Sequence, residues 1–139
     1  MGAMLADPRI RAGINIDGTT ERQLSDTGLP RPFLLLGRQD QYSPGSGPAA
    51  ATWESDWEQL TGWKRWLVVS GAEHASFTDI SLLAEQIGFP RRAALPPARA
   101  SEITRRYTRA FFDLHLGSVP QPLLDGPSSQ YPEVEFVNN

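Results

Sequence analysis

Residues 68–79 read VVSGAEHASFTD, and they join an apolar run, a sharp turn, a histidine and a helix start. The apolar run ends at Gly71, His74 follows on the turn, and Ser76 begins the next segment. A side chain placed this way comes just after the carboxyl end of a strand, where open α/β sheets keep their functional sites. The stretch therefore predicts a strand–loop–helix unit with His74 at the functional edge of a sheet.

Two earlier runs have the same character as the apolar run that leads into Gly71. Residues 11–17 (RAGINID), 32–37 (PFLLLG) and 65–70 (RWLVVS) each predict a short strand. The second and third are almost continuously apolar, which is typical of strands covered on both faces. Strands that alternate with helices pair in parallel through right-handed crossovers. The predicted fold class is α/β, with a short parallel sheet flanked by helices.

Three helices are expected around these strands. Thr52 is predicted to cap a helix over residues 52–60. Ser76 and Asp79 resemble a capping box that opens a helix to about Ile87. The longest helix is predicted to begin after Pro96-Pro97 and to run to about Leu116, because apolar residues recur there at helical spacing.

The remaining segments lack periodicity. Residues 42–51 are predicted to form a loop, and 118–139, with prolines at 120, 122, 127 and 132, are predicted to be an extended tail over the surface. No internal repeat or composition shift divides the chain. We therefore expect a single domain over 1–139.

Composition excludes several classes of function. The chain has 139 residues, a formal net charge of −3 and no cysteine. Without a basic cluster there is no source for nucleic-acid affinity, and no apolar run approaches the ~20 residues that span a bilayer. Thiolate metal sites are excluded, and two distant histidines make a poor metal constellation, so no metal or cofactor is expected.

His74 is the candidate catalytic base, because a base must sit on a loop where one ring nitrogen reaches a nucleophile and a carboxylate holds the other. Asp17 and Asp40 compete for the carboxylate role, since each follows a predicted strand that ends at the same edge as His74. Spacing alone leaves both open. His115 falls in the last turn of a helix, where a structural role is the better interpretation.

Residues 13–18 (GINIDG), 31–37 (RPFLLLG) and 71–79 (GAEHASFTD) resemble three successive blocks of the platelet-activating-factor acetylhydrolase-like and actinobacterial lipase-like α/β-hydrolases. The resemblance covers nearly the whole chain and implies the C-terminal half of that fold. It assigns the catalytic acid to Asp17. In many other α/β-hydrolases the acid comes one strand later, which would assign it to Asp40.

The chain departs from this family because it contains no Gly-x-Ser-x-Gly nucleophile elbow. Gly-Ser-Gly at 45–47 lacks the strand–turn–helix setting of an elbow. The resemblance implies that the elbow and the loop with the second oxyanion-hole N–H precede residue 1. We expect a carboxylic-ester hydrolase fragment that carries the acid and the histidine and is inactive alone.

The alternative hypothesis is a non-catalytic binding or assembly module that acts through an exposed sheet edge. In the first case the partners are a small-molecule or lipid ester and a complementary N-terminal fragment. In the second, the first strand offers an open edge, which favours a homo-oligomer.

Overall fold

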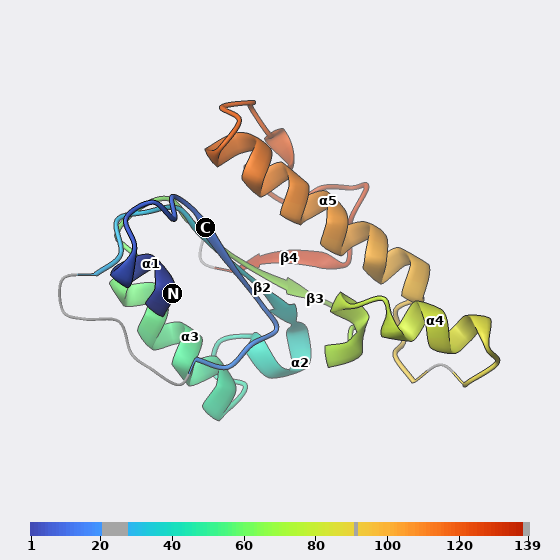
Figure 1. Ribbon diagram of the computed structural model, residues 1–139. Coiled ribbons are helices and arrows are strands. Elements are labelled where there is room, and N and C mark those ends of the chain that lie inside the picture. Colours follow the sequence, from blue (N-terminus) through green and yellow to red (C-terminus); the bar gives the residue numbers. More distant parts are fainter. Residues whose placement is uncertain (21–27, 91, 138–139) are drawn as a thin grey trace.

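The computed structural model describes residues 1–20, 28–90 and 92–137, which form a sheet between two groups of helices (Figure 1). In chain order the elements are α1 (Gly2–Ala6), β1 (Gly13–Ile16), β2 (Phe33–Arg38), α2 (Gln39–Tyr42), α3 (Pro48–Gln59), β3 (Lys64–Val69), the 3-10 helix η1 (His74–Phe77), α4 (Ile80–Gln86), α5 (Pro97–His115), the 3-10 helix η2 (Pro122–Leu124) and β4 (Val134–Val137). The predicted α/β class and the flanked sheet are confirmed.

The sheet has four strands in the order β1-β2-β3-β4. β1, β2 and β3 are parallel neighbours, and β4 pairs antiparallel with β3. Ile16 lies opposite Leu36, which in turn lies opposite Leu67. Because the first three strands are parallel, their carboxyl ends meet at one edge, and the chain leaves that edge at Asp17, Arg38 and Ser70.

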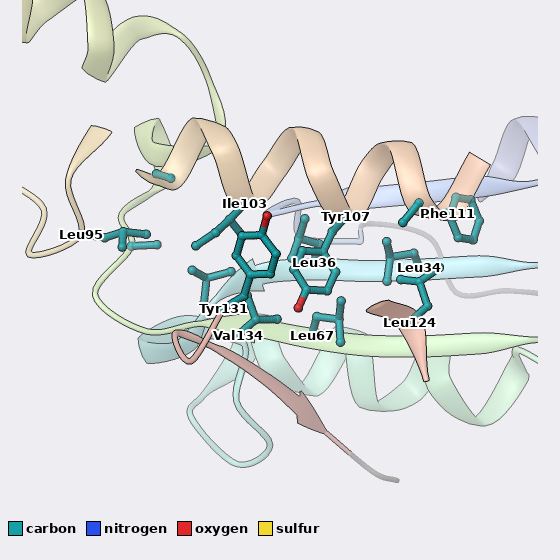
Figure 2. Close-up of a cluster of buried hydrophobic side chains, with 14 of the residues drawn as sticks. Leu34, Leu36, Leu67, Leu95, Ile103, Tyr107, Phe111, Leu124, Tyr131 and Val134 are labelled. Carbon is teal, nitrogen blue, oxygen red and sulfur yellow. The ribbon is translucent and has the colours of Figure 1, made fainter. Parts of the chain in front are cut away.

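α5 covers one face of the sheet. Alternate residues of the central strands, including Leu34, Leu36 and Leu67, point toward Tyr107 and Phe111 of this helix (Figure 2). Every second residue of a strand faces this layer, and the helix residues that pack against them recur about every 3.6 positions. α5 begins at Pro97, within the proline pair after which the helix was predicted to start, and ends one residue before the predicted Leu116. In the described part of the chain, no helix is long and apolar enough to cross a bilayer.

The opposite face is covered by α3 and by α1. Leu35 and Trp66, which alternate with the residues that face α5, pack with Tyr42 and Trp53 in a second buried cluster. Tyr42 and Trp53 are stacked, with ring centroids 4.0 Å apart. The near-continuous apolar character of β2 and β3 therefore reflects burial on both faces.

α3 begins earlier than the sequence predicted. The helix starts at Pro48 after the N-cap Gly47, whereas Thr52 was expected to cap it. Proline fits the first helical position because its fixed φ suits a helix and its missing N–H would lack a partner there anyway. Residues 48–51 therefore belong to the helix, and the predicted loop over 42–51 is correspondingly shorter.

The segment after His74 also differs from the prediction of one helix over 76–87. Ser76 lies inside η1 and forms a capping box with Glu73, whereas α4 starts only at Ile80. Asp79 is the N-cap residue of α4 but makes no side-chain capping hydrogen bond. Thr78 separates the two helices: its hydroxyl donates to the Ala75 carbonyl and accepts from the Ile80 N–H. A threonine that bonds the local backbone competes with helix continuation.

The C-terminal segment does more than the extended tail predicted over 118–139. Within the described residues 118–137, η2 and β4 are formed, and Leu124, Tyr131 and Val134 are buried in the α5 cluster. Arg99 of α5 ties this segment down through an ion pair with Glu133, with 2.9 Å between Nε and Oε1. The strand was missed because four residues after a proline-rich stretch carry too little periodicity. Residues 138–139 lie outside the described part.

Candidate active site

The carboxyl ends of β1, β2 and β3 form one edge, and the polar side chains singled out in the sequence lie along it. Asp17 directly follows β1, Asp40 lies in α2 just after β2, and His74 follows β3 across the turn at Gly71. Gly71 has a φ of 71°, in the left-handed region that favours glycine. Its carbonyl accepts from the Leu95 N–H at 2.9 Å, which fixes the exit of the chain from β3.

His74 and Asp17 are in direct contact. Nδ1 of His74 lies 2.6 Å from Oδ2 of Asp17, although 57 positions of sequence separate the two residues. The Asp17 side chain is 1% exposed and the His74 side chain 71% exposed. A ring held by a buried carboxylate through Nδ1 carries its proton there and presents Nε2 as an acceptor. The arrangement can take up and return a proton at Nε2.

Asp17 is fixed by contacts on both carboxylate oxygens. Oδ1 accepts from the backbone N–H of Arg38 at 2.8 Å, which leaves Oδ2 to His74. The Asp17 N–H donates to the Leu36 carbonyl at 2.8 Å. The Arg38 Nε lies 3.7 Å from Oδ2 and adds a positive charge to the environment of the carboxylate. Burying a carboxylate is costly unless it is paired and hydrogen-bonded, and these contacts meet that need.

The structure does not bring Asp40 to His74. The Asp40 side chain is 77% exposed, and its Oδ1 lies 3.8 Å from the Arg38 Nε. The two aspartates that spacing could not separate are thus distinguished by geometry. Asp17 contacts the ring, while the Asp40 carboxylate lies near the Arg38 guanidinium.

Two aromatic residues support the Asp17 turn from the sheet face that α3 covers. The Tyr42 hydroxyl donates to the Asp17 carbonyl at 3.2 Å, and the Trp53 Nε1–H donates to the Gly18 carbonyl at 2.8 Å. Tyr42 and Trp53 are both buried. Hydrogen bonds from two buried side chains therefore hold the turn in place.

The comparisons with known proteins agree with this architecture. No family model matches the chain. A curated relative, a probable 1-alkyl-2-acetylglycerophosphocholine esterase of Arthroderma benhamiae, is 30% identical over 158 aligned residues, which cover 99% of this chain and 40% of the relative. The solved structure of a ferulic acid esterase from Streptomyces cinnamoneus superposes with a TM-score of 0.89 at 40% identity, covering 99% of this chain and 42% of that one.

The chain has the fold of part of an α/β-hydrolase and resembles esterases of that superfamily. The predicted resemblance to esterases of this superfamily is confirmed by both relatives. The chain spans about two fifths of the length of each of them.

Sequence reasoning missed several residues that shape this part of the α/β-hydrolase fold. Gly37 is one, because a Cβ there would lie 2.7 Å from the Trp53 ring, 2.8 Å from Tyr42 and 3.2 Å from Asp17 Oδ1. A glycine inside an apolar strand signals close approach of another group, and that signal was present in the sequence. The backbone N–H of Arg38, by contrast, leaves no trace in a sequence.

The second histidine of the chain lies elsewhere. His115, at the end of α5, packs against the rings of Trp63 and Phe111, with centroids 4.3 and 4.9 Å away. Burial lowers the pKa of His115. Its predicted structural role fits these contacts. Among the described residues, no cluster of three histidine, aspartate or glutamate side chains could hold a metal ion.

Proposed function

We propose that this chain supplies the general base and its orienting carboxylate to a serine-dependent hydrolase of carboxylic esters. His74 is the base and Asp17 is the acid that holds it. The observation that carries the proposal is the 2.6 Å contact between a largely exposed imidazole and a buried carboxylate at the carboxyl edge of a parallel sheet. The esterase relatives support the reaction class.

In the proposed reaction, Nε2 of His74 takes the proton of a serine hydroxyl as the serine oxygen attacks the ester carbonyl. The protonated ring then gives that proton to the departing alcohol, which leaves an acyl-enzyme. A water molecule, deprotonated by the same nitrogen, attacks the acyl carbonyl and releases the acid. Asp17 keeps the ring in the tautomer that can accept at Nε2 and stabilises the transient imidazolium.

The serine and the oxyanion-hole N–H groups are proposed to come from a segment outside residues 1–139. The sequence has no Gly-x-Ser-x-Gly, and the chain corresponds to only part of each relative. A complementary N-terminal segment is therefore the proposed partner. The relatives are described as esterases of an acetylated glycerophosphocholine and of ferulic acid, so a small-molecule or lipid carboxylic ester is the proposed substrate class.

The test uses matched acid-to-amide variants in the protein that joins these residues to the serine-bearing segment. Asp17→Asn should lower kcat for p-nitrophenyl acetate by about 10⁴-fold, because the ring loses its correct tautomer. His74→Gln should be at least as damaging. Asp40→Asn, at an exposed position away from the ring, should stay within a few-fold of the parent.

Two outcomes would reject the assignment. Near-normal turnover by Asp17→Asn, with an inactive Asp40→Asn, would transfer the orienting role to Asp40. Rapid ester hydrolysis by the 139-residue chain alone would show that the serine and oxyanion donors need not come from outside it. The expected rate for that chain is the uncatalysed background, since each missing oxyanion donor alone costs about 10²–10³ in kcat.

A second candidate function is assembly through the edge of the sheet. Within the described residues β1 pairs only with β2, so its other side offers backbone groups for pairing. A hollow of about 420 Å³ beside β1 is lined by residues that include Met1, Ile14 and Phe33. Two results together would favour this module. The chain would associate stably with itself, and substitution of His74 would have no catalytic effect in any assembly.

A further inference from the structure

The turn that presents Asp17 is closed by a side chain that plays no part in the proposed proton transfer. Asn15 lies two residues before Asp17 and is half-buried in β1. Its Oδ1 accepts from the Gly18 N–H at 3.1 Å, and its Nδ2 donates to the Gly18 carbonyl at 2.9 Å. The Asn15 amide thus makes two hydrogen bonds to Gly18. Ile16 and Asp17 lie in the short loop that these bonds close.

Asp17 needs such a restraint because its backbone is in an uncommon conformation. Its φ is 51°, and among the described residues Ser118 is the one other non-glycine residue with a positive φ. The left-handed region is unfavourable for a residue with a Cβ and persists only where the surroundings enforce it. We call the two hydrogen bonds between the Asn15 amide and Gly18 the clamp. Because the clamp spans Asp17, it restrains the direction of the Asp17 side chain.

Gly18 is matched to this clamp. A Cβ at position 18 would lie 2.7 Å from Asn15 Oδ1, closer than real Cβ contacts, and the φ of Gly18 is outside the left-handed region. A methyl group at position 18 would therefore displace the Asn15 amide, whereas the backbone conformation of Gly18 does not itself call for glycine. The Gly18 carbonyl also accepts from Trp53 Nε1, so one oxygen links the clamp to the buried aromatic pair.

We propose that Asn15 is a positioning residue, which holds the turn at Asp17 so that Oδ2 meets Nδ1 of His74. The catalytic part of this proposal rests on the proposed function, but the geometric part does not. A lost clamp lets the Asp17 backbone leave the left-handed region. The carboxylate then swings away from the ring, and the Nδ1–H tautomer loses its stabilising partner.

The geometric part is tested in the 139-residue chain by the tautomer of His74, read from the ¹⁵N shifts of its ring nitrogens. A neutral imidazole bonded to a carboxylate through Nδ1 carries its proton there, whereas an unrestrained ring favours Nε2. The parent chain and the Gln39→Ala control should show the Nδ1–H form. Gln39 is an apt control because its amide bonds Glu135 and not the Asp17 turn.

Asn15→Ala should shift the ring toward the Nε2–H form. Gly18→Ala should do the same without removing any polar group, because its methyl displaces the Asn15 amide. The double variant should resemble Asn15→Ala, since the methyl has nothing left to displace; this non-additivity separates the clamp from general destabilisation. A folded Asn15→Ala chain with the parent tautomer would overturn the proposal, and so would strictly additive effects of the two substitutions.

The catalytic part is tested by kinetics in the protein that includes the serine-bearing segment. Asn15→Ala should lower kcat by about 10-fold to 100-fold, as expected when a group that orients an active-site side chain is lost, with KM within about twofold. An unchanged kcat together with a shifted tautomer would reject the catalytic role of the His74–Asp17 pair while leaving the clamp intact. An unchanged kcat with an unchanged tautomer would reject the clamp itself.

Discussion

Asp17, at the carboxyl edge of the sheet, combines burial of its carboxylate with a contact to an exposed histidine. Its carboxylate is nearly inaccessible, yet in the proposed reaction it holds the His74 ring. The Arg38 N–H donates to Oδ1, and the Arg38 Nε lies 3.7 Å from Oδ2, so the buried carboxylate has a hydrogen bond and a neighbouring positive charge. Asp40 is largely exposed, and its Oδ1 lies 3.8 Å from the same Arg38 Nε. One arginine thus contributes its backbone and its charge to the buried acid.

Tyr107 gives a prediction about alkaline pH. It is fully buried, its hydroxyl has no hydrogen-bond partner within the described residues, and burial raises its pKa to about 12. Above about pH 10 the unfolded chain loses this proton while the folded chain retains it, so the free energy of unfolding falls by about 1.4 kcal/mol per pH unit until about pH 12.

Tyr107→Phe should remove that part of the decline. Urea unfolding at pH 7 and at several values above 10 measures the effect. At pH 7 the variant should be as stable as the parent or slightly more stable, because the lost hydroxyl had no partner. Parallel alkaline decline in both proteins would contradict the assignment to Tyr107.

The choice between Asp17 and Asp40 marks the limit of sequence reasoning at the scale of residues. Both follow parallel strands, and the spacing of each to its strand is equally suitable. The contact with His74 depends on the left-handed turn at Asp17 and on an N–H from the neighbouring strand. Those features are tertiary, so only the family resemblance pointed toward Asp17 in advance.

At the scale of elements, β2 is built around a close approach that fixes the site. Gly37 lies between the aromatic pair of α2 and α3 and the carboxylate of Asp17. Gly37→Ala should destabilise the fold by about 1–3 kcal/mol, because the added methyl overpacks a rigid aromatic contact. Thermal or urea unfolding measures this.

Gly126→Ala is the matched control for this substitution. A Cβ at position 126 would meet nothing within 4 Å, and the φ of Gly126 is outside the left-handed region. Its stability should stay within about 0.5 kcal/mol of the parent. If the two alanine variants have the same free energy of unfolding, the Trp53 ring can move aside for the added methyl group without destabilising the fold.

The elements that were predicted well carry long or uniform patterns. The α5 helix spans 19 residues with buried positions at helical spacing, and β2 and β3 are continuous apolar runs. The start of α3 and the break at Thr78 were mispredicted because a single proline and a single hydroxyl decide them. β4 was missed because its formation depends on an open side of β3, which no local pattern reveals.

At the scale of the whole molecule, the chain brings the proposed acid–base pair together from the ends of two strands of its own sheet. Asp17 follows β1 and His74 follows β3, and Tyr42 and Trp53 of the helical layer also hold the Asp17 turn. The pair is therefore preorganised in this chain, whereas the proposed nucleophile and oxyanion donors are not. Under the proposed function, the segment that supplies the serine would therefore meet a His74–Asp17 pair that is already in contact.

The open side of β1 leads to a prediction about assembly. Within the described residues, β1 is paired on one side, and its residues are half-buried rather than covered. An unpaired strand edge offers free backbone N–H and C=O groups, which promote association with another strand. The 139-residue chain should therefore form dimers, measured by size-exclusion chromatography with light scattering.

Two lysine variants locate the contact. Ile16→Lys places a charge on β1 and should shift the chain toward monomer, because a charged side chain on an edge strand opposes strand addition. Ile80→Lys places the same charge on α4, at a side chain that is 65% exposed, and should leave the dimer intact. Dissociation by Ile80→Lys alone would move the interface to α4, where Leu83, Ile87 and the adjacent Phe89 also expose apolar surface. A well-folded parent monomer would contradict the edge argument, because it would mean that β1 is stable in water with one partner strand.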